Sequence, residues 1–210
     1  MKDLLKLYDE FFKTLSKRVE ESNTQIIEAA SPDEVDNLAS EFNIFIPDDI
    51  RSYLCEPKTV YKIKRFTDTE EWEAGFDFLQ IDIIRRNISM YRDDLAPIYE
   101  DEDDNFLYNL HLNCVPLSFA EPALVYDADP LIKKPGLYLM LWDGEASFEP
   151  IAPDFTTFFT HWLASGCFRG REFKKYWEVV KDIVPIKIPL NENLWLNYYS
   201  RLYKNQYTIF

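Results

Sequence analysis

Five consecutive acidic residues, 100–104, form the densest cluster of possible ligand or docking groups in the sequence. A calcium loop of the EF-hand type needs alternating oxygen ligands, a glycine at its sharp turn and a glutamate at position 12. Asp101 and Asp103 have the alternating spacing, but no glycine follows them and position 12 counted from Asp101 is Leu112. The cluster therefore predicts no metal site. Two interpretations stay open: a solvated loop, or a surface that docks a basic partner.

The cysteines and histidines offer a possible nucleophile and its base. His111 and Cys114 lie close together in the segment HLNC, and His161 lies near Cys167. Spacing does not exclude such a pair, because its members meet in space and not in sequence. Cys114 lies in an apolar stretch, however, and a free cysteine usually behaves as a small hydrophobic residue, so a buried structural role is favoured. Two histidines and three scattered cysteines give no zinc ligand set.

Closely spaced carboxylates are the remaining candidates for acid–base chemistry. Asp127 with Asp129, and Asp143 with Glu145, are two residues apart, which places both members on one face of a strand. A chain with 37 acidic residues contains such pairs by chance, and Asp127 shortly before Pro130 is typical of a turn. The sequence therefore predicts no catalytic residue and no cofactor.

The composition excludes several classes of function. The chain has 210 residues and a net charge of −14, whereas nucleic acids and anionic membranes are bound through Lys and Arg, so we expect neither as a partner. The 5 glycines form neither a phosphate-binding loop nor a GxGxxG fingerprint. Three separated cysteines, no signal-peptide pattern and no long apolar window predict a soluble, cytoplasmic protein.

The acidic charge is concentrated in the middle of the chain. Residues 31–165 carry 10 basic and 27 acidic side chains, a net charge of −17, whereas residues 166–210 have a net charge of +4. We therefore expect three parts: an N-terminal helix in residues 1–24, an α+β domain in residues 25–165, and a basic helical extension in residues 166–210. The extension is rich in Trp and Tyr, so we expect it to pack on the domain.

Hydrophobic periodicity predicts helices that flank short strands. Helices are expected over residues 3–21, 32–42, 47–54, 68–95, 154–163, 171–183 and 192–204. Strands are expected over residues 60–66, 106–112, 115–119, 123–126 and 137–142. Aromatic residues expected in the core are Trp142, Phe148, Phe155, Phe158, Phe159 and Trp162. This order predicts an α+β fold with an antiparallel or mixed sheet of short strands flanked by helices.

Three segments, in this order, resemble the SUKH (SMI1/KNR4) superfamily. Residues 31–54 resemble its opening helix, a turn that here reads Ile46-Pro47, and a second helix. Residues 115–136 are similar to its strand pairs with an aromatic–Asp step, here Tyr126-Asp127. Residues 151–163 resemble its closing helix. The stretch 72–110 is longer than in the minimal domain of that family.

The resemblance implies a SUKH-like α+β domain without catalytic machinery. Bacterial members of the family are commonly immunity proteins that neutralise a toxin, often a nuclease, and fungal relatives are interaction modules in cell-wall and stress signalling. We therefore expect a non-enzymatic protein-binding domain, most concretely an intracellular immunity protein that occludes a basic toxin. A regulatory scaffold and an enzyme of unrecognised type are the alternatives. The expected docking surface comprises Asp93, Asp94, Glu100, Asp101, Glu102, Asp103, Asp104, Asp127 and Asp129.

Overall fold

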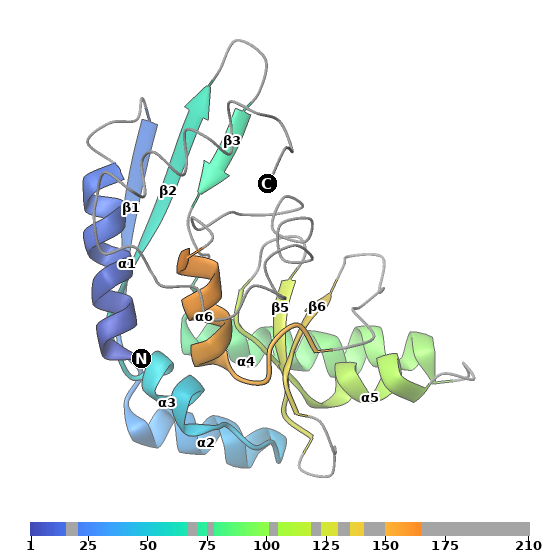
Figure 1. Ribbon diagram of the computed structural model, residues 1–210. Helices are drawn as coiled ribbons and strands as arrows, with labels where there is room; N and C mark the ends of the chain where they lie inside the picture. The colour runs from blue at the N-terminus through green and yellow to red at the C-terminus, as the bar shows by residue number, and fades with distance from the viewer. Residues whose placement is uncertain are drawn as a thin grey trace.

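The computed structural model describes residues 1–15, 21–66, 71–74, 78–100, 105–118, 123–129, 135–140 and 150–164. In this part of the chain, helices are interspersed with short strands that form two antiparallel sheets of three strands each. The fold is therefore α+β, as the sequence predicts. Figure 1 shows the first sheet beside α1 (Lys2–Leu15), and the second sheet beside α4 (Ile81–Met90) and α5 (Asn105–Asn113).

The first sheet has the strand order β1-β2-β3. β1 (Glu21–Ile27) pairs along its whole length with β2 (Lys58–Phe66), and β3 (Glu71–Ala74) pairs with the other edge of β2. The strand expected over residues 60–66 is confirmed. β1 was not predicted, because its sequence ESNTQII has few apolar residues and its partner lies far along the chain. The expected boundary between residues 24 and 25 falls inside β1.

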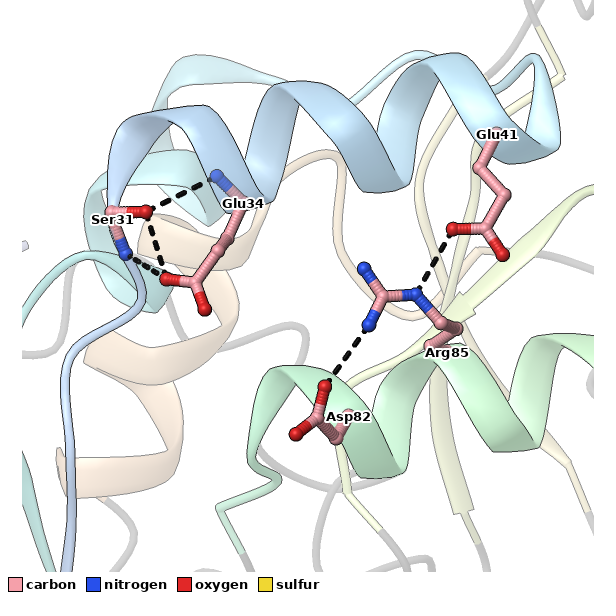
Figure 2. Close-up of polar contacts among 5 residues, drawn as sticks. All are labelled: Ser31, Glu34, Glu41, Asp82 and Arg85. Atoms are coloured by element: carbon pink, nitrogen blue, oxygen red, sulfur yellow. Dashed lines mark hydrogen bonds and ion pairs between the residues drawn. The ribbon is translucent and has the colours of Figure 1, made fainter.

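The first turn of α2 (Pro32–Phe42) is fixed by local sequence. Ser31 Oγ accepts a hydrogen bond from the backbone N–H of Glu34 at 3.2 Å, and the backbone N–H of Ser31 donates to the Glu34 carboxylate at 2.7 Å (Figure 2). This reciprocal arrangement is a capping box, which satisfies two backbone donors that the helix itself leaves free. The helix predicted over residues 32–42 is confirmed, and so is the next helix, α3 (Asp48–Leu54).

Replacing Ser31 with alanine is expected to lower the free energy of unfolding by about 1 kcal/mol. The cause is the loss of the side-chain acceptor for the Glu34 N–H. Urea denaturation followed by tryptophan fluorescence measures the change. Ser31→Thr is the matched control, because it keeps a capping hydroxyl and should retain most of the stability. Equal stabilities of Ser31→Ala and the unchanged protein would show that the capping box contributes nothing.

α2 and α4 lie side by side, as Figure 2 shows. Arg85 of α4 donates from Nε to the Glu41 carboxylate of α2 at 3.0 Å, and from Nη1 to Asp82 on its own helix at 3.0 Å. All three side chains are partly or largely exposed, so these ion pairs contribute little to stability. The Arg85–Glu41 pair joins the last turn of α2 to α4. α4 continues into a π-helical turn, η2 (Tyr91–Leu95), and a 3₁₀ turn, η3 (Ala96–Tyr99).

The second sheet has the strand order β4-β5-β6, comprising β4 (Cys114–Pro116), β5 (Ala123–Asp127) and β6 (Leu137–Met140). The three strands predicted in this region are confirmed; β4 ends at Pro116, before the expected end, and residues 141–142 of the strand expected over 137–142 lie outside the described residues. Every residue of β4 and β6 is buried. Gly136 precedes β6 at a point where a Cβ atom would lie 2.8 Å from the carbonyl oxygen of Ala152, so the close approach of these backbones requires glycine.

Two elements predicted from periodicity are wrong. The long helix expected over residues 68–95 contains β3 and a bridge from Phe78 to Ser118 before α4 begins at Ile81. These pairings are long-range, and tertiary contacts of this kind override local preference. Residues 106–112, expected as a strand, belong to the helix α5. A short apolar run of this length does not distinguish a strand from a buried helix by periodicity alone, and α5 packs its buried residues Leu110 and His111 inside the domain.

Aromatic side chains of α1 and α6 (Phe155–Ala164) meet in the main core. The ring of Tyr8 lies 5.8 Å from that of Trp162 and 6.0 Å from that of Phe159. Asp154 begins α6 by accepting a hydrogen bond from the Thr157 N–H at 2.7 Å. The expected burial of the α6 aromatics is confirmed for Phe155, Phe158, Phe159 and Trp162. α1 therefore belongs to the main core, whereas a second, smaller cluster forms around η2, α5 and the second sheet.

Several sequence predictions fall outside the described residues. They concern Trp142, Phe148, the acidic residues 101–104 and the whole extension 166–210. The helices expected over residues 171–183 and 192–204 therefore stay predictions. Among the helices that the structure does describe, the longest has 14 residues, and none combines the length and apolar character needed to cross a lipid bilayer.

Candidate partner-binding site: an acidic ridge

Three of the expected docking residues lie on the turns that follow α4. Asp93 and Asp94 lie on η2, and Glu100 comes directly after η3. All three are exposed. Pro97 and Ile98, in the middle of η3, are exposed too, and Ile98 has 62% of its surface exposed. We call these five exposed residues the acidic ridge: Asp93, Asp94, Pro97, Ile98 and Glu100.

Pro97 explains why the backbone of the acidic ridge departs from a regular α-helix. The proline ring clashes with the carbonyl group four residues earlier, that of Asp93, and proline has no N–H to donate. The chain instead makes a π-helical turn, in which the Ala96 N–H donates to the carbonyl oxygen of Tyr91, followed by a 3₁₀ turn. π-helical turns are rare overall, but those that occur are often found at functional sites. The turn therefore marks Asp93 and Asp94 as candidate functional residues.

Aromatic packing beneath the acidic ridge holds it in place. The Tyr99 ring stacks on His111 of α5, with centroids 5.1 Å apart and an interplanar angle of 14°, and Tyr91 meets the same imidazole edge-on at 5.8 Å. Nδ1 of His111 lies 2.7 Å from the carbonyl oxygen of Leu107. Burial lowers the pKa of His111. A neutral imidazole therefore contacts two tyrosines, and His111 and Tyr91 are buried whereas the acidic residues of the ridge are exposed.

Arg92 ties η2 to the end of α2. Its Nη2 donates to the carbonyl oxygen of Phe42 at 2.7 Å, and its guanidinium lies 5.2 Å from the centre of the Phe42 ring. Burial lowers the pKa of this arginine, although its neighbour Asp93 acts in the opposite direction. Arg92 is therefore an anchor within the molecule, and the carboxylates that follow it, those of Asp93 and Asp94, are the groups available to a partner.

The structure removes Asp127 from the expected docking surface. Asp127 is only 2% exposed, lies on β5 opposite Cys114, and accepts a hydrogen bond from the Asp129 N–H at 3.0 Å. Burial raises the pKa of its carboxyl group to about 6, and the charge of Asp129 acts in the same direction. The alternative interpretation of Asp127 as a turn residue fits this geometry. Asp129 itself is partly exposed at the end of β5.

Cys114 and His111 do not form an activated nucleophile. Cys114 is fully buried, and burial raises the pKa of its thiol, with the nearby Asp127 carboxylate acting in the same direction. The thiol therefore stays protonated, whereas a nucleophilic cysteine needs a lowered pKa. This agrees with the structural role that the sequence favours for Cys114. The side chains of His161 and Cys167 lie outside the described part.

Lys58 lines a hollow of about 640 Å³ between α1 and the first sheet, yet its role is structural. Its ammonium group donates to the carbonyl oxygens of Tyr53 at 2.7 Å, Glu56 at 2.8 Å and Leu54 at 3.4 Å. These acceptors include the last carbonyls of α3, so Lys58 caps that helix. Burial lowers its pKa to about 8. All three ammonium protons have acceptors, which leaves no donor for a ligand.

Phe45 is an exposed residue that sequence reasoning missed. It follows α2, and 59% of its surface is exposed, whereas its neighbours Ile44 and Ile46 are buried. The apolar run IFIP does not by itself show which member faces solvent. An extended backbone with alternating faces is the signal that could have identified it.

The comparisons with other proteins add no relative from which a role could be transferred. The resemblance to the SUKH superfamily therefore rests on the three sequence segments, and the acidic ridge is interpreted from its geometry and charge. No protein-family model, no curated protein and no solved structure matches this chain.

Proposed function

We propose that this chain is a SUKH-like protein-binding domain whose acidic ridge engages a basic partner. The most concrete form of the proposal is an intracellular immunity protein that neutralises a basic toxin, such as a nuclease, by occlusion. A regulatory scaffold is the alternative. The resemblance of the three segments supports the class of protein, and the net charge of −17 in residues 31–165 supports the choice of partner.

The observation that carries the proposal is the grouping on the acidic ridge. Asp93, Asp94 and Glu100 are exposed and lie on the same short segment as Ile98, which is also exposed. Interfaces commonly place an apolar contact inside a polar, charged rim. The acidic ridge also lies within the stretch 72–110, which is longer than in the minimal SUKH domain. An addition to a common domain is a suitable place for a partner-specific surface.

The proposed mechanism is competition for the basic residues of the partner. A nuclease uses Lys and Arg to neutralise phosphates, and carboxylates of the acidic ridge would pair with the same side chains. Opposite charges accelerate association, and they disfavour acidic partners. The fixed backbone of η2 and η3 lowers the entropy that binding costs, because the carboxylates are already arranged.

The first experiment is a pull-down from the native host with the tagged full chain, at low salt and at about 0.5 M salt, followed by mass spectrometry. A stoichiometric basic partner that is lost at high salt supports immunity by occlusion. A partner that remains bound at high salt favours the scaffold. If no basic protein is retained at either salt concentration, the proposed charge pairing is contradicted.

Reversing two charges on the acidic ridge is expected to slow association with that partner. Asp93→Lys/Asp94→Lys should lower the association rate at low salt by about tenfold or more, because long-range attraction becomes repulsion. Stopped-flow or surface plasmon resonance measures this rate. The matched control is Glu10→Lys/Glu28→Lys, which makes the same change in net charge at exposed positions elsewhere. Equal slowing in both variants would show a response to net charge alone.

A further inference from the structure

We propose that the partner-binding surface extends from the acidic ridge to Phe45, and that the Phe45 ring receives an arginine side chain of the basic partner. This inference rests on the proposed function and deepens it, because it specifies the chemistry of the partner. It is carried by the exposure of Phe45, by the way its backbone is held, and by the carboxylate residues on the segments next to it.

The backbone around Phe45 is fixed independently of its side chain. Asn43 ends α2 in the left-handed region with φ 49°, and the Ile44 N–H donates to the Ala39 carbonyl oxygen at 3.0 Å. The Phe45 N–H donates to the carbonyl oxygen of Ala128, just after β5, at 3.3 Å. These backbone contacts fix the main chain at Phe45, whose side chain is 59% exposed, so presenting it to a partner needs no backbone rearrangement.

Phe45 and the acidic ridge are connected through the end of α2. Arg92, which directly precedes Asp93, donates to the carbonyl oxygen of Phe42, three residues before Phe45. Asp129 follows the residue that accepts the Phe45 N–H, and Asp48 is exposed three residues after Phe45. Carboxylates thus occur on η2, after β5 and at the start of α3, the three segments that meet at the end of α2.

An exposed aromatic ring with carboxylate residues on neighbouring segments fits a guanidinium group better than it fits an apolar side chain. Arginine stacks on aromatic rings and pairs with carboxylates through a planar set of donors, whereas the lysine ammonium is more strongly hydrated. The chain contains an internal example nearby, since the Arg92 guanidinium lies over the Phe42 ring. By contrast Ile26, which is 72% exposed, has an aliphatic side chain with no aromatic face for a guanidinium group.

The test uses two fluorescent probe peptides, one alternating arginine with glycine and one alternating lysine with glycine, titrated with the full chain at about 0.05 M salt. The unchanged protein should bind the arginine peptide more tightly than the lysine peptide by about twofold to fivefold. Phe45→Ala and Phe45→Leu should both abolish this preference, because neither side chain has an aromatic face. Ile26→Ala is the matched control, an exposed apolar truncation elsewhere, and should keep the preference.

The outcomes separate this inference from the proposed function. A preference for arginine that survives in Phe45→Ala overturns the role of Phe45. If the Phe45 role is overturned in this way but Asp93→Asn/Asp94→Asn weakens the binding of both peptides, the role of the acidic ridge in binding a basic partner remains supported. The absence of binding by either peptide at low salt overturns the inference, and the pull-down then decides the proposed function separately.

Discussion

Replacing Phe12 with alanine is expected to lower the free energy of unfolding by about 3 to about 5 kcal/mol, the largest single effect among our predictions. Phe12 lies on α1 with none of its surface exposed. Its ring stacks on Tyr61 of β2 at 5.2 Å and lies 4.7 Å from Tyr8. Alanine at this position leaves a cavity between α1 and the first sheet. The free-energy cost of this cavity adds to the transfer free energy lost with the buried ring.

Phe11 provides the control next to it in the chain. Phe11 is partly exposed and packs only at the margin of the core, so Phe11→Ala should cost about 1 kcal/mol. Urea unfolding monitored by fluorescence compares the two variants. Small and equal losses would mean that α1 is an appended helix, as a boundary at residue 24 implies. A large loss confined to Phe12 would show that residues 1–15 are part of the folding unit.

Features of the fold that depend on neighbouring residues could be predicted from the sequence. Ser31 and Glu34 are three residues apart and form the capping box by themselves, so the start of α2 was predicted correctly. The apolar runs of β5 and β6 likewise indicated strands, because both are buried over most of their length. In these places local preference and tertiary structure agree.

Features that depend on distant residues could not be predicted in this way. The polar strand β1 is a strand because β2 pairs with it, and β3 interrupts a helical pattern for the same reason. The acidic ridge was partly predicted: Asp93, Asp94 and Glu100 are exposed, as expected. The π-helical turn beneath them and the exposure of Phe45 follow from Pro97 and from a contact with Ala128, which composition does not reveal.

Asp127 shows most clearly how burial changes the meaning of a carboxylate. From the sequence it is one of many acidic residues in a negative region, but β5 places it inside the domain with its Oδ1 on the Asp129 N–H. Burial raises its pKa from 3.8 to about 6. Between these two values the folded chain binds more protons than the unfolded chain. The free energy of unfolding therefore falls as the pH rises through this range, and above about pH 6 the destabilisation by the buried Asp127 carboxylate reaches its full size.

Replacing Asp127 with asparagine is therefore expected to stabilise the protein at neutral pH. Asparagine keeps the oxygen that accepts the Asp129 N–H and carries no charge, so at about pH 8 the free energy of unfolding should rise by up to about 3 kcal/mol. The gain should shrink as the pH falls below about 6, because aspartic acid at this position then becomes neutral too. Urea unfolding across this pH range measures the difference, with Asp93→Asn as a control that removes an exposed carboxylate and should change stability by less than about 0.5 kcal/mol. A loss of stability in Asp127→Asn at every pH would mean that the ionised carboxylate is stabilised by the fold, and that its pKa is not raised.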